Sequence, residues 1–121
     1  MSMGIDSKSA AEVLSRARFS HLDENGLQAA IANELRAAFP DAAVRREVRI
    51  GQGERIDLLA DRLGIEVKVA GSVGAVRRQL VRYANSGVLD ELLLVSTRVA
   101  HRAVTDEFGR VPVMVVTPRW L

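Results

Sequence analysis

The spacing of apolar residues predicts two helices in the first third of the chain, at residues 9–18 and 22–38. The apolar side of the first consists of Val13, Leu14 and Ala17, and that of the second of Leu27, Ile31, Leu35 and Ala38. Pro40 cannot continue a helix, so the second is expected to end before it. Residues 1–8 are polar and are expected to form a disordered tail.

Shorter apolar segments with a period of two predict strands in the rest of the chain. Residues 65–69 alternate strictly, with Glu66 and Lys68 on one side, whereas residues 92–95 form a continuous apolar run typical of a buried central strand. The remaining strands are expected at residues 44–50, 55–60 and 111–116, and further helices at 72–86, capped by Ser72, and at 99–108.

These elements follow the order α-α-β-β-β-α-β-α-β, which predicts an α/β fold with a mixed, four- to five-stranded sheet flanked by helices. The crossover from residue 68 to residue 92 is expected to be parallel and right-handed. A chain of 121 residues is expected to form a single domain, residues 1–121, that buries a substantial core.

Acidic residues on two of the predicted strands suggest a metal site. Asp57 lies in the middle of an apolar segment, where both strand propensity and burial disfavour it. A hairpin that pairs Ala60 with Ile65 would make Asp57 and Glu66 diagonal neighbours, able to share a divalent cation. Lys68 would share their face, and it is one of only two lysines in the chain. The alternative is an amphipathic strand whose charged side faces water.

The acid, the short hairpin and the Glu66-Val67-Lys68 segment, with a helix on each side, resemble the PD-(D/E)XK nuclease superfamily. The resemblance covers roughly residues 22–116 and departs from the motif at Ile56, where the family often has proline. It implies a restriction-endonuclease-like fold in which Asp57, Glu66 and the backbone carbonyl of Val67 bind Mg²⁺, or Mn²⁺ in its place. Lys68 would then orient or activate the attacking water.

The resemblance also implies a further acid on the helix before the strands, for which Glu24 and Glu34 are the candidates. On a helical wheel Glu24 lies at the centre of the apolar stripe and Glu34 toward its edge, so we favour Glu24 as a catalytic metal ligand. The alternative is a first-turn acid that interacts with the helix dipole. Glu47 is interpreted as an ion-pair partner of neighbouring arginines.

Gln79 and Tyr83 lie four residues apart on one face of the predicted helix at 72–86. The pair resembles a motif of the RecB-like and lambda-exonuclease-like branches of the superfamily, which implies that both side chains position the phosphate. The alternative is that Tyr83 is an aromatic residue at the rim of the core and Gln79 a polar edge residue.

Composition narrows the chemistry. The chain contains no cysteine and only two histidines, His21 and His101, which excludes disulfides and thiolate zinc sites and argues against histidine-based ones. We interpret His101 as a structural residue and His21 as a helix-start residue. The net charge is +2, and arginines suited to DNA phosphates cluster in two segments: Arg45, Arg46, Arg49 and Arg55, and then Arg77, Arg78 and Arg82. These clusters could equally be solvated surfaces. No run is long enough to span a bilayer, and a cytoplasmic location is expected.

These observations predict an Mg²⁺-dependent DNA nuclease. Stand-alone cores of this size in the resembled superfamily include Holliday-junction resolvases, which implies a homodimeric endonuclease for branched DNA with a role in repair or recombination. The apolar segment 111–116 and Trp120 offer a possible dimer surface, although Trp120 could instead fold back onto its own domain. Other functions left open are a RecB-like or lambda-like exonuclease, a non-catalytic nucleic-acid-binding module, and a subunit of a larger assembly.

Overall fold

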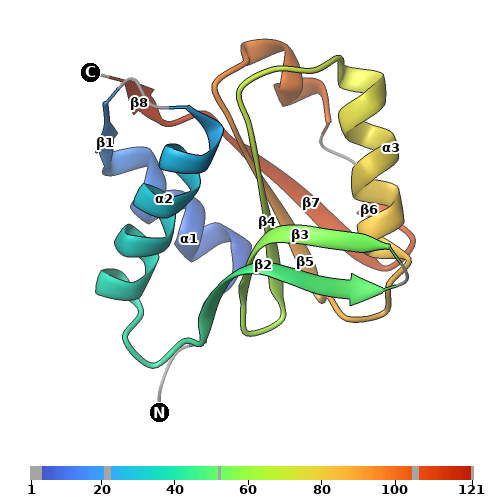
Figure 1. Ribbon diagram of the computed structural model, residues 1–121, viewed down its shortest axis with the longest axis horizontal. Helices are drawn as coiled ribbons and strands as arrows, with labels where there is room; N and C mark the ends of the chain where they lie inside the picture. Colours follow the sequence, from blue (N-terminus) through green and yellow to red (C-terminus); the bar gives the residue numbers. More distant parts are fainter. Residues whose placement is uncertain (1–3, 21–22, 52, 105–106, 121) are drawn as a thin grey trace.

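The computed structural model describes residues 4–20, 23–51, 53–104 and 107–120, without the side chains of Glu107 and Trp120 (Figure 1). The helices are α1 (Ser7–Arg16), α2 (Glu24–Ala38), α3 (Val73–Ala84) and the 3-10 helix η1 (Val99–Ala103). The strands are β1 (Arg18–Phe19), β2 (Val44–Gly51), β3 (Glu54–Ala60), β4 (Leu63–Lys68), β5 (Glu91–Ser96), β6 (Glu107–Phe108), β7 (Val111–Val116) and β8 (Arg119–Trp120).

The main sheet has the order β2-β3-β4-β5-β7-β6. Strands β2, β3 and β4 form an antiparallel meander, β4, β5 and β7 are parallel, and the two-residue β6 pairs antiparallel with β7 at the far edge. The predicted α/β fold with a mixed sheet of five longer strands is therefore confirmed. Helix α3 connects β4 to β5, and the two strands pair in parallel as predicted. Strand β5 is buried, as its apolar run predicted.

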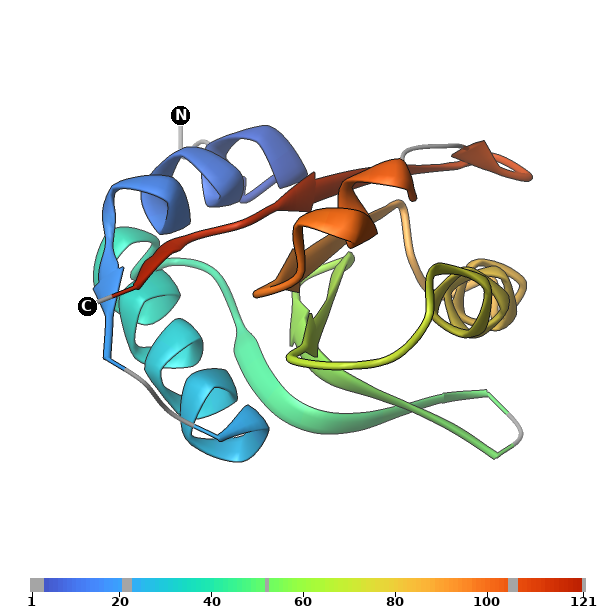
Figure 2. The ribbon, with the colours of Figure 1, turned by 90° about the horizontal axis from the view of Figure 1, so that it is seen from above.

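Helices cover both faces of the sheet (Figure 2). The face under α1 and α2 holds one apolar cluster, in which Leu27, Ile31 and Leu35 are fully buried as their helical spacing predicted. The face under α3 and η1 holds the other, built around Leu80, Leu92 and Leu94. Strand β3 contributes residues to both clusters, and the site described below lies on this strand, between them.

Short polar side chains cap the helix starts, Ser72 as predicted and Asp23 without having been predicted. Ser72 accepts a hydrogen bond from the Ala75 amide at 3.1 Å, and Asp23 accepts one from the Gly26 amide at 2.7 Å. Each satisfies a backbone donor that a helix start leaves unpaired. Leu22 and His21, from which the second helix was expected to begin, lie outside the described residues.

The predicted register of the β3–β4 hairpin is wrong by two residues. Ala60 pairs with Leu63 and Leu58 with Ile65, so that only Asp61 and Arg62 form the turn. Asp61 adopts the left-handed conformation that such a tight turn requires, with φ 53°. Its side chain accepts a hydrogen bond from the Ala43 amide at 3.0 Å, and its own amide donates to the Ala43 carbonyl at 3.1 Å. These contacts with the start of β2 fix the turn.

Two other boundaries also differ from the prediction. The helix expected at residues 99–108 ends at Ala103, because Phe108 pairs with Val111 in a hairpin that turns at Gly109, with φ 67°. The expected disordered tail is wrong for the residues just before α1. Ile5 is buried, and the Ser7 hydroxyl donates to the Glu91 carboxylate at 2.6 Å.

The C-terminal strands pair with other strands of the same chain. Strand β7 lies between β5 and β6, and the short β8 pairs in parallel with β1, with Trp120 opposite Phe19. On the side of β7 away from β5, only Val111 and Pro112 pair with β6 among the described residues. The predicted homodimer stays a prediction. Within the described part of the chain, no helix is long and apolar enough to cross a membrane.

Gly64 is required by a close approach between β4 and its neighbours. A Cβ atom there would lie 2.6 Å from Ile56 Cδ1 and 2.7 Å from Leu89 Cδ1. We therefore expect Gly64→Ala to lower the free energy of unfolding by about 1–3 kcal/mol, the usual cost of overpacking. Urea denaturation measures this, with Gly4→Ala as the control, because nothing lies within 4 Å of a Cβ at that position. Equal stability of both variants would contradict the packing described.

Candidate active site

Asp57 and Glu66 lie where the backbone pairing of β3 and β4 stops. The last paired residues are Leu58 and Ile65; beyond them each carboxylate accepts a hydrogen bond from the other strand's backbone. The Asp57 amide donates to Glu66 Oε1 at 3.2 Å, and the Val67 amide donates to Asp57 Oδ2 at 2.8 Å. The two side chains thus replace the missing ladder, and this reciprocal contact holds both acids in place.

Strand β3 turns over at Asp57. Ile56 packs in the cluster under α3, whereas Leu58 packs in the cluster under α1 and α2, although residues two apart in a regular strand share a face. Opposite Asp57 in the register, Glu47 of β2 has φ 55°, an uncommon conformation for a residue other than glycine. The change of face brings Asp57 to the surface between the two cores, where it is half-buried.

Lys68 completes the predicted acid-x-lysine arrangement. Its Nζ atom lies 3.4 Å from Glu66 Oε2, and its side chain is 22% exposed. Lys68 lies opposite Ser96 of β5, at the carboxyl end of the two central parallel strands. The ammonium is therefore next to the carboxylate pair and still accessible to solvent. The structure brings together the three residues singled out in the sequence, Asp57, Glu66 and Lys68.

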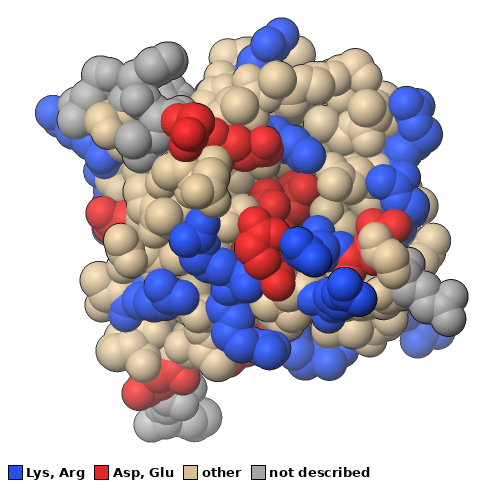
Figure 3. Space-filling model, viewed as in Figure 1, with Lys and Arg blue, Asp and Glu red and all other residues tan. Residues whose placement is uncertain are grey.

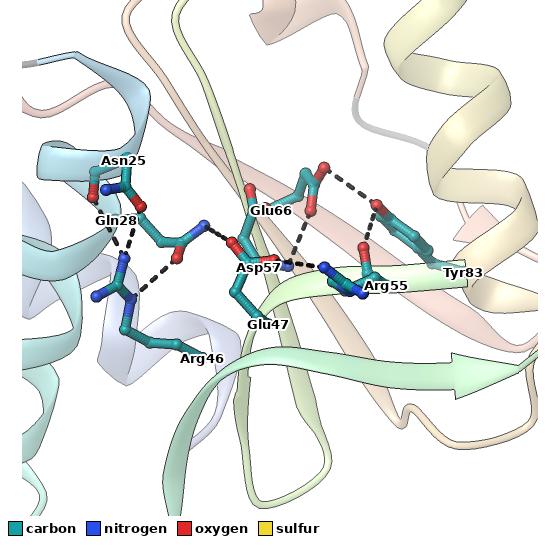
Figure 4. A network of polar contacts seen from close by, with 8 residues as sticks. All are labelled: Asn25, Gln28, Arg46, Glu47, Arg55, Asp57, Glu66 and Tyr83. Atoms are coloured by element: carbon teal, nitrogen blue, oxygen red, sulfur yellow. Dashed lines mark hydrogen bonds and ion pairs between the residues drawn. The ribbon is translucent and has the colours of Figure 1, made fainter. Parts of the chain in front are cut away.

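Tyr83 contacts Glu66 (Figure 4), and Gln79 in turn contacts Tyr83. The Tyr83 hydroxyl lies 3.1 Å from Glu66 Oε2 and 3.0 Å from the Arg55 carbonyl, and Gln79 Nε2 donates to that hydroxyl at 2.8 Å. Tyr83 is only 1% exposed, and its hydroxyl faces Glu66. The role of the Gln79–Tyr83 pair in positioning the phosphate stays a prediction.

The start of α2 forms the other wall of the site. A hollow of about 350 Å³ is lined by Asp23, Glu24, Asn25, Gln28, Glu47 and Asp57. Glu24 is close enough to Asp57 and Lys68 for their charges to act on its pKa, as its place on the helical wheel predicted. Glu34 lies ten residues further along α2, is exposed, and lines no part of this hollow.

Gln28 is a site residue that sequence reasoning missed. It is 3% exposed; its Nε2 donates to Glu47 Oε1 at 3.3 Å, and its Oε1 accepts from Arg46 Nε at 2.9 Å (Figure 4). The available signal was a polar residue four positions after Glu24, next to the apolar Leu27 of the buried face. Gln28 fixes Glu47, which in turn lies 4.0 Å from Arg55. The predicted ion pair of Glu47 is thus present but long.

Burial dominates the electrostatics of these acids. Burial, reinforced by the charge of Asp57, raises the pKa of Glu66 to about 8, and Lys68 offsets only part of this shift. Burial likewise raises the pKa of Asp57 and the pKa of Glu24, which also feels the charge of Asp57. Burial and the adjacent Glu66 raise the pKa of Tyr83, so the phenol stays protonated. The site holds more carboxylate than its single lysine can neutralise.

The donor set fits a hard divalent cation. Mg²⁺ commonly takes one or two carboxylates and keeps several waters, and Asp57 and Glu66 provide two. The Val67 amide points at Asp57, and the amide and carbonyl of one strand residue project to the same side, so the Val67 carbonyl also faces the site. Among the described residues no group of three acidic or histidine side chains forms a ready-made metal cage. Waters or substrate would complete the coordination.

The predicted arginines surround these acids unevenly. Figure 3 shows acidic side chains gathered at the centre of one face, with basic groups on either side. Arg46 is tied to Gln28 and to Asn25, and Arg82 to Glu54 at 2.9 Å, so neither is available without breaking a contact. Arg77 lies over the Phe108 ring at 5.5 Å. The other predicted phosphate ligands, Arg45, Arg49, Arg55 and Arg78, are exposed.

His101 is structural, as predicted, though in a 3-10 turn. It is 1% exposed, with Nδ1 lying 2.6 Å from the Ser96 hydroxyl and Nε2 lying 2.7 Å from the Gly71 carbonyl. These bonds tie the loop after Lys68 to the end of β5.

Comparison of the chain with protein-family models, with curated proteins and with solved structures found no match.

Proposed function

We propose that this protein is a metal-dependent nuclease that hydrolyses phosphodiester bonds in DNA. The observation that carries the proposal is the opening of the β3–β4 ladder, where Asp57 and Glu66 bond to each other's strands and Lys68 lies 3.4 Å from Glu66. A purely structural role for this trio is a poor explanation. Burying Glu66 beside a second acid costs stability, which a fold would avoid by placing an apolar residue there.

Asp57, Glu66 and the Val67 carbonyl would hold Mg²⁺ or Mn²⁺. The bound cation would supply positive charge to the scissile phosphate and lower the pKa of a coordinated water. The chain's own groups then have distinct roles. The Lys68 ammonium holds the attacking water beside Glu66, and its proton can be exchanged, which a guanidinium cannot do. Tyr83 and Gln79 keep the Glu66 carboxylate oriented, and Glu24 extends the acidic wall from α2.

The DNA substrate is supported by charge placement. An acidic centre with exposed arginines beside it suits a backbone whose phosphate is attacked while its neighbours are held. A module that only binds nucleic acid would gain nothing from two clustered acids next to phosphates. A preference for branched DNA, as in resolvases, is part of the proposal that substrate comparison must test.

A single set of cleavage assays tests the proposal. Purified protein is incubated with Mg²⁺ or Mn²⁺ on supercoiled, linear, flapped, four-way-junction and single-stranded DNA, and on RNA. Cleavage that disappears with a chelator and returns with the cation supports a nuclease. Nicking of closed circles identifies an endonuclease, and digestion from linear ends alone an exonuclease. Absence of cleavage on every substrate with both cations contradicts the proposal.

The two acids of α2 give a matched pair of variants. We expect Glu24→Gln to lower cleavage by roughly ten- to a thousandfold, the scale of losing one positioned charged group. Glu34→Gln should be nearly silent, because that side chain lies away from the site hollow. Single-turnover rates measure both effects, and thermal melting checks that each variant folds. A larger loss with Glu34→Gln would show that the wrong helical acid has been assigned.

A further inference from the structure

Two arginines face each other across the β2–β3 hairpin beside the site. Arg49 of β2 and Arg55 of β3 are direct partners in the register. Side chains directly opposite in an antiparallel pair share a face and lie close together, and like charges there destabilise the pair. The chain has therefore placed two permanent positive charges where they repel each other.

Little in the hairpin neutralises these charges. Arg55 has only the 4.0 Å contact with Glu47, with both side chains about half exposed. Within the described part of the chain, Arg49 makes no ion pair or side-chain hydrogen bond. Glu54, which precedes Arg55 in the chain, is paired with Arg82 at 2.9 Å. Arg49, Gly53, Glu54 and Arg55 line an open hollow of about 310 Å³. The hollow could therefore hold an anion, whose charge would balance the two guanidinium groups.

The position of the pair relative to the acids defines which anion. Arg55 contacts Glu47 at 4.0 Å, and Glu47 and Asp57 line the same hollow, so Arg55 lies on the side of β3 that carries the acids. Figure 4 shows Arg55 beside Asp57 and Glu47. Two residues along a strand span about 7 Å, comparable with the separation of neighbouring phosphates in an extended nucleotide chain. A strand whose phosphate is at Asp57 would thus bring the next phosphate to the arginines.

We propose that Arg49 and Arg55 together bind the phosphate adjacent to the scissile one, on one side of it only. This inference rests on the proposed nuclease function and specifies its substrate: the cut strand runs along β3 toward the hairpin tip and must carry a phosphodiester there. Guanidinium groups suit the task because they stay charged and offer paired donors to phosphate oxygens. Phosphate between the two arginines would also relieve their mutual repulsion.

Neutral linkages in the substrate provide the test. An oligonucleotide substrate of the DNA form that the cleavage assays identify, with one methylphosphonate in the cut strand, is cleaved under single-turnover conditions, and each linkage is resolved on a sequencing gel. The modified linkage itself should resist cleavage. We expect cleavage at the neighbouring linkage on one side alone to fall roughly tenfold, the scale of losing a charge-assisted contact. In the Arg49→Gln/Arg55→Gln double variant, the methylphosphonate should lower cleavage at that same neighbouring linkage by less than about twofold, relative to the unmodified oligonucleotide.

Arg110→Gln is the matched control, since it removes one exposed arginine from the turn before β7. It should keep the wild-type pattern. The inference would be overturned if the methylphosphonate lowered cleavage equally at both neighbouring linkages. It would also be overturned if the loss at one neighbour were as large in the double variant as in the wild type. A folding role is tested by thermal melting. Relief of repulsion predicts that the double variant melts at the same or a higher temperature, and a lower one would contradict the clamp.

A binding arm keeps the inference testable apart from catalysis. Affinity of the unmodified oligonucleotide for Asp57→Asn protein is measured over a range of salt concentrations. The Arg49→Gln/Arg55→Gln double variant should reduce the slope of log affinity against log salt by about 0.7–0.9, the range for one phosphate contact on single-stranded or duplex DNA. An unchanged slope overturns the clamp. Absence of cleavage with any substrate instead contradicts the proposed nuclease function.

Discussion

Asp57→Asn and Glu66→Gln should each lower DNA cleavage by at least about a thousandfold, the upper range for removing one preorganised electrostatic contact. Both substitutions keep the size of the side chain and remove the negative charge that would hold the cation. Both also preserve an oxygen that can accept the existing backbone hydrogen bond, from the Val67 amide or the Asp57 amide. The loss is measured in single-turnover assays with Mg²⁺.

DNA affinity separates this loss from a failure to fold. Removing a carboxylate relieves repulsion toward phosphate, so both variants should bind DNA as tightly as the wild type or more tightly. Lys68→Ala should also be inactive, and Lys68→Arg should restore little, because arginine cannot exchange a proton. Glu34→Gln, with the same chemical change on α2 away from the site, is the control. Wild-type cleavage by Asp57→Asn, Glu66→Gln and Lys68→Ala together would refute the assignment.

The sequence predicted which residues meet in the site because their strands carry strong local signals. The strict alternation around Glu66 placed it on one side with Lys68, and the continuous apolar run at residues 92–95 placed a central strand beside them. The helical spacing of Leu27, Ile31 and Leu35 gave the direction of Glu24. Each of these features depends on neighbours in the chain.

What the sequence did not predict depends on contacts between distant segments. The hairpin turn is set by Asp61 bonding to Ala43, and Asp-Arg is not a typical two-residue turn sequence. The turnover at Asp57 accompanies a left-handed Glu47 on another strand, for which no local signal exists. The spacing of Gln79 and Tyr83 put them on one helix face, but the contact of the Tyr83 hydroxyl with Glu66 depends on how α3 crosses the sheet.

The raised pKa of Glu66 predicts an unusual pH dependence of stability in the metal-free protein. Glu66 keeps its proton in the folded state up to about pH 8, whereas a glutamate in the unfolded chain has a pKa of 4.5. Between these values the folded state binds more protons than the unfolded state, so stability should fall as pH rises from about 5 to 8. The raised pKa of Asp57 acts in the same direction. The decrease should be on the order of a few kcal/mol, since one pKa unit corresponds to about 1.4 kcal/mol.

Urea denaturation in the presence of a chelator, at pH 5, 6, 7 and 8, measures this decrease. Glu66→Gln carries no titrating proton at that position, so its stability should depend less on pH and should exceed that of the wild type most clearly at pH 8. Glu34→Gln should follow the wild type. Identical pH profiles for the wild type and Glu66→Gln would show that Glu66 does not hold its proton in the folded protein.

Divalent cations should reverse the trend, because they bind the ionised carboxylates and not the protonated ones. Affinity for Mg²⁺ should rise with pH up to about 8, and binding at pH 7 should release about one proton, since a group with a pKa near 8 is then mostly protonated. Calorimetry in two buffers of different ionisation enthalpy counts that proton. Binding stabilises the folded state, so the melting temperature should rise with Mg²⁺ at pH 8 and hardly at pH 5. Equal stabilisation at both pH values would place the cation away from Asp57 and Glu66, and with it the chemistry that those two acids are proposed to support.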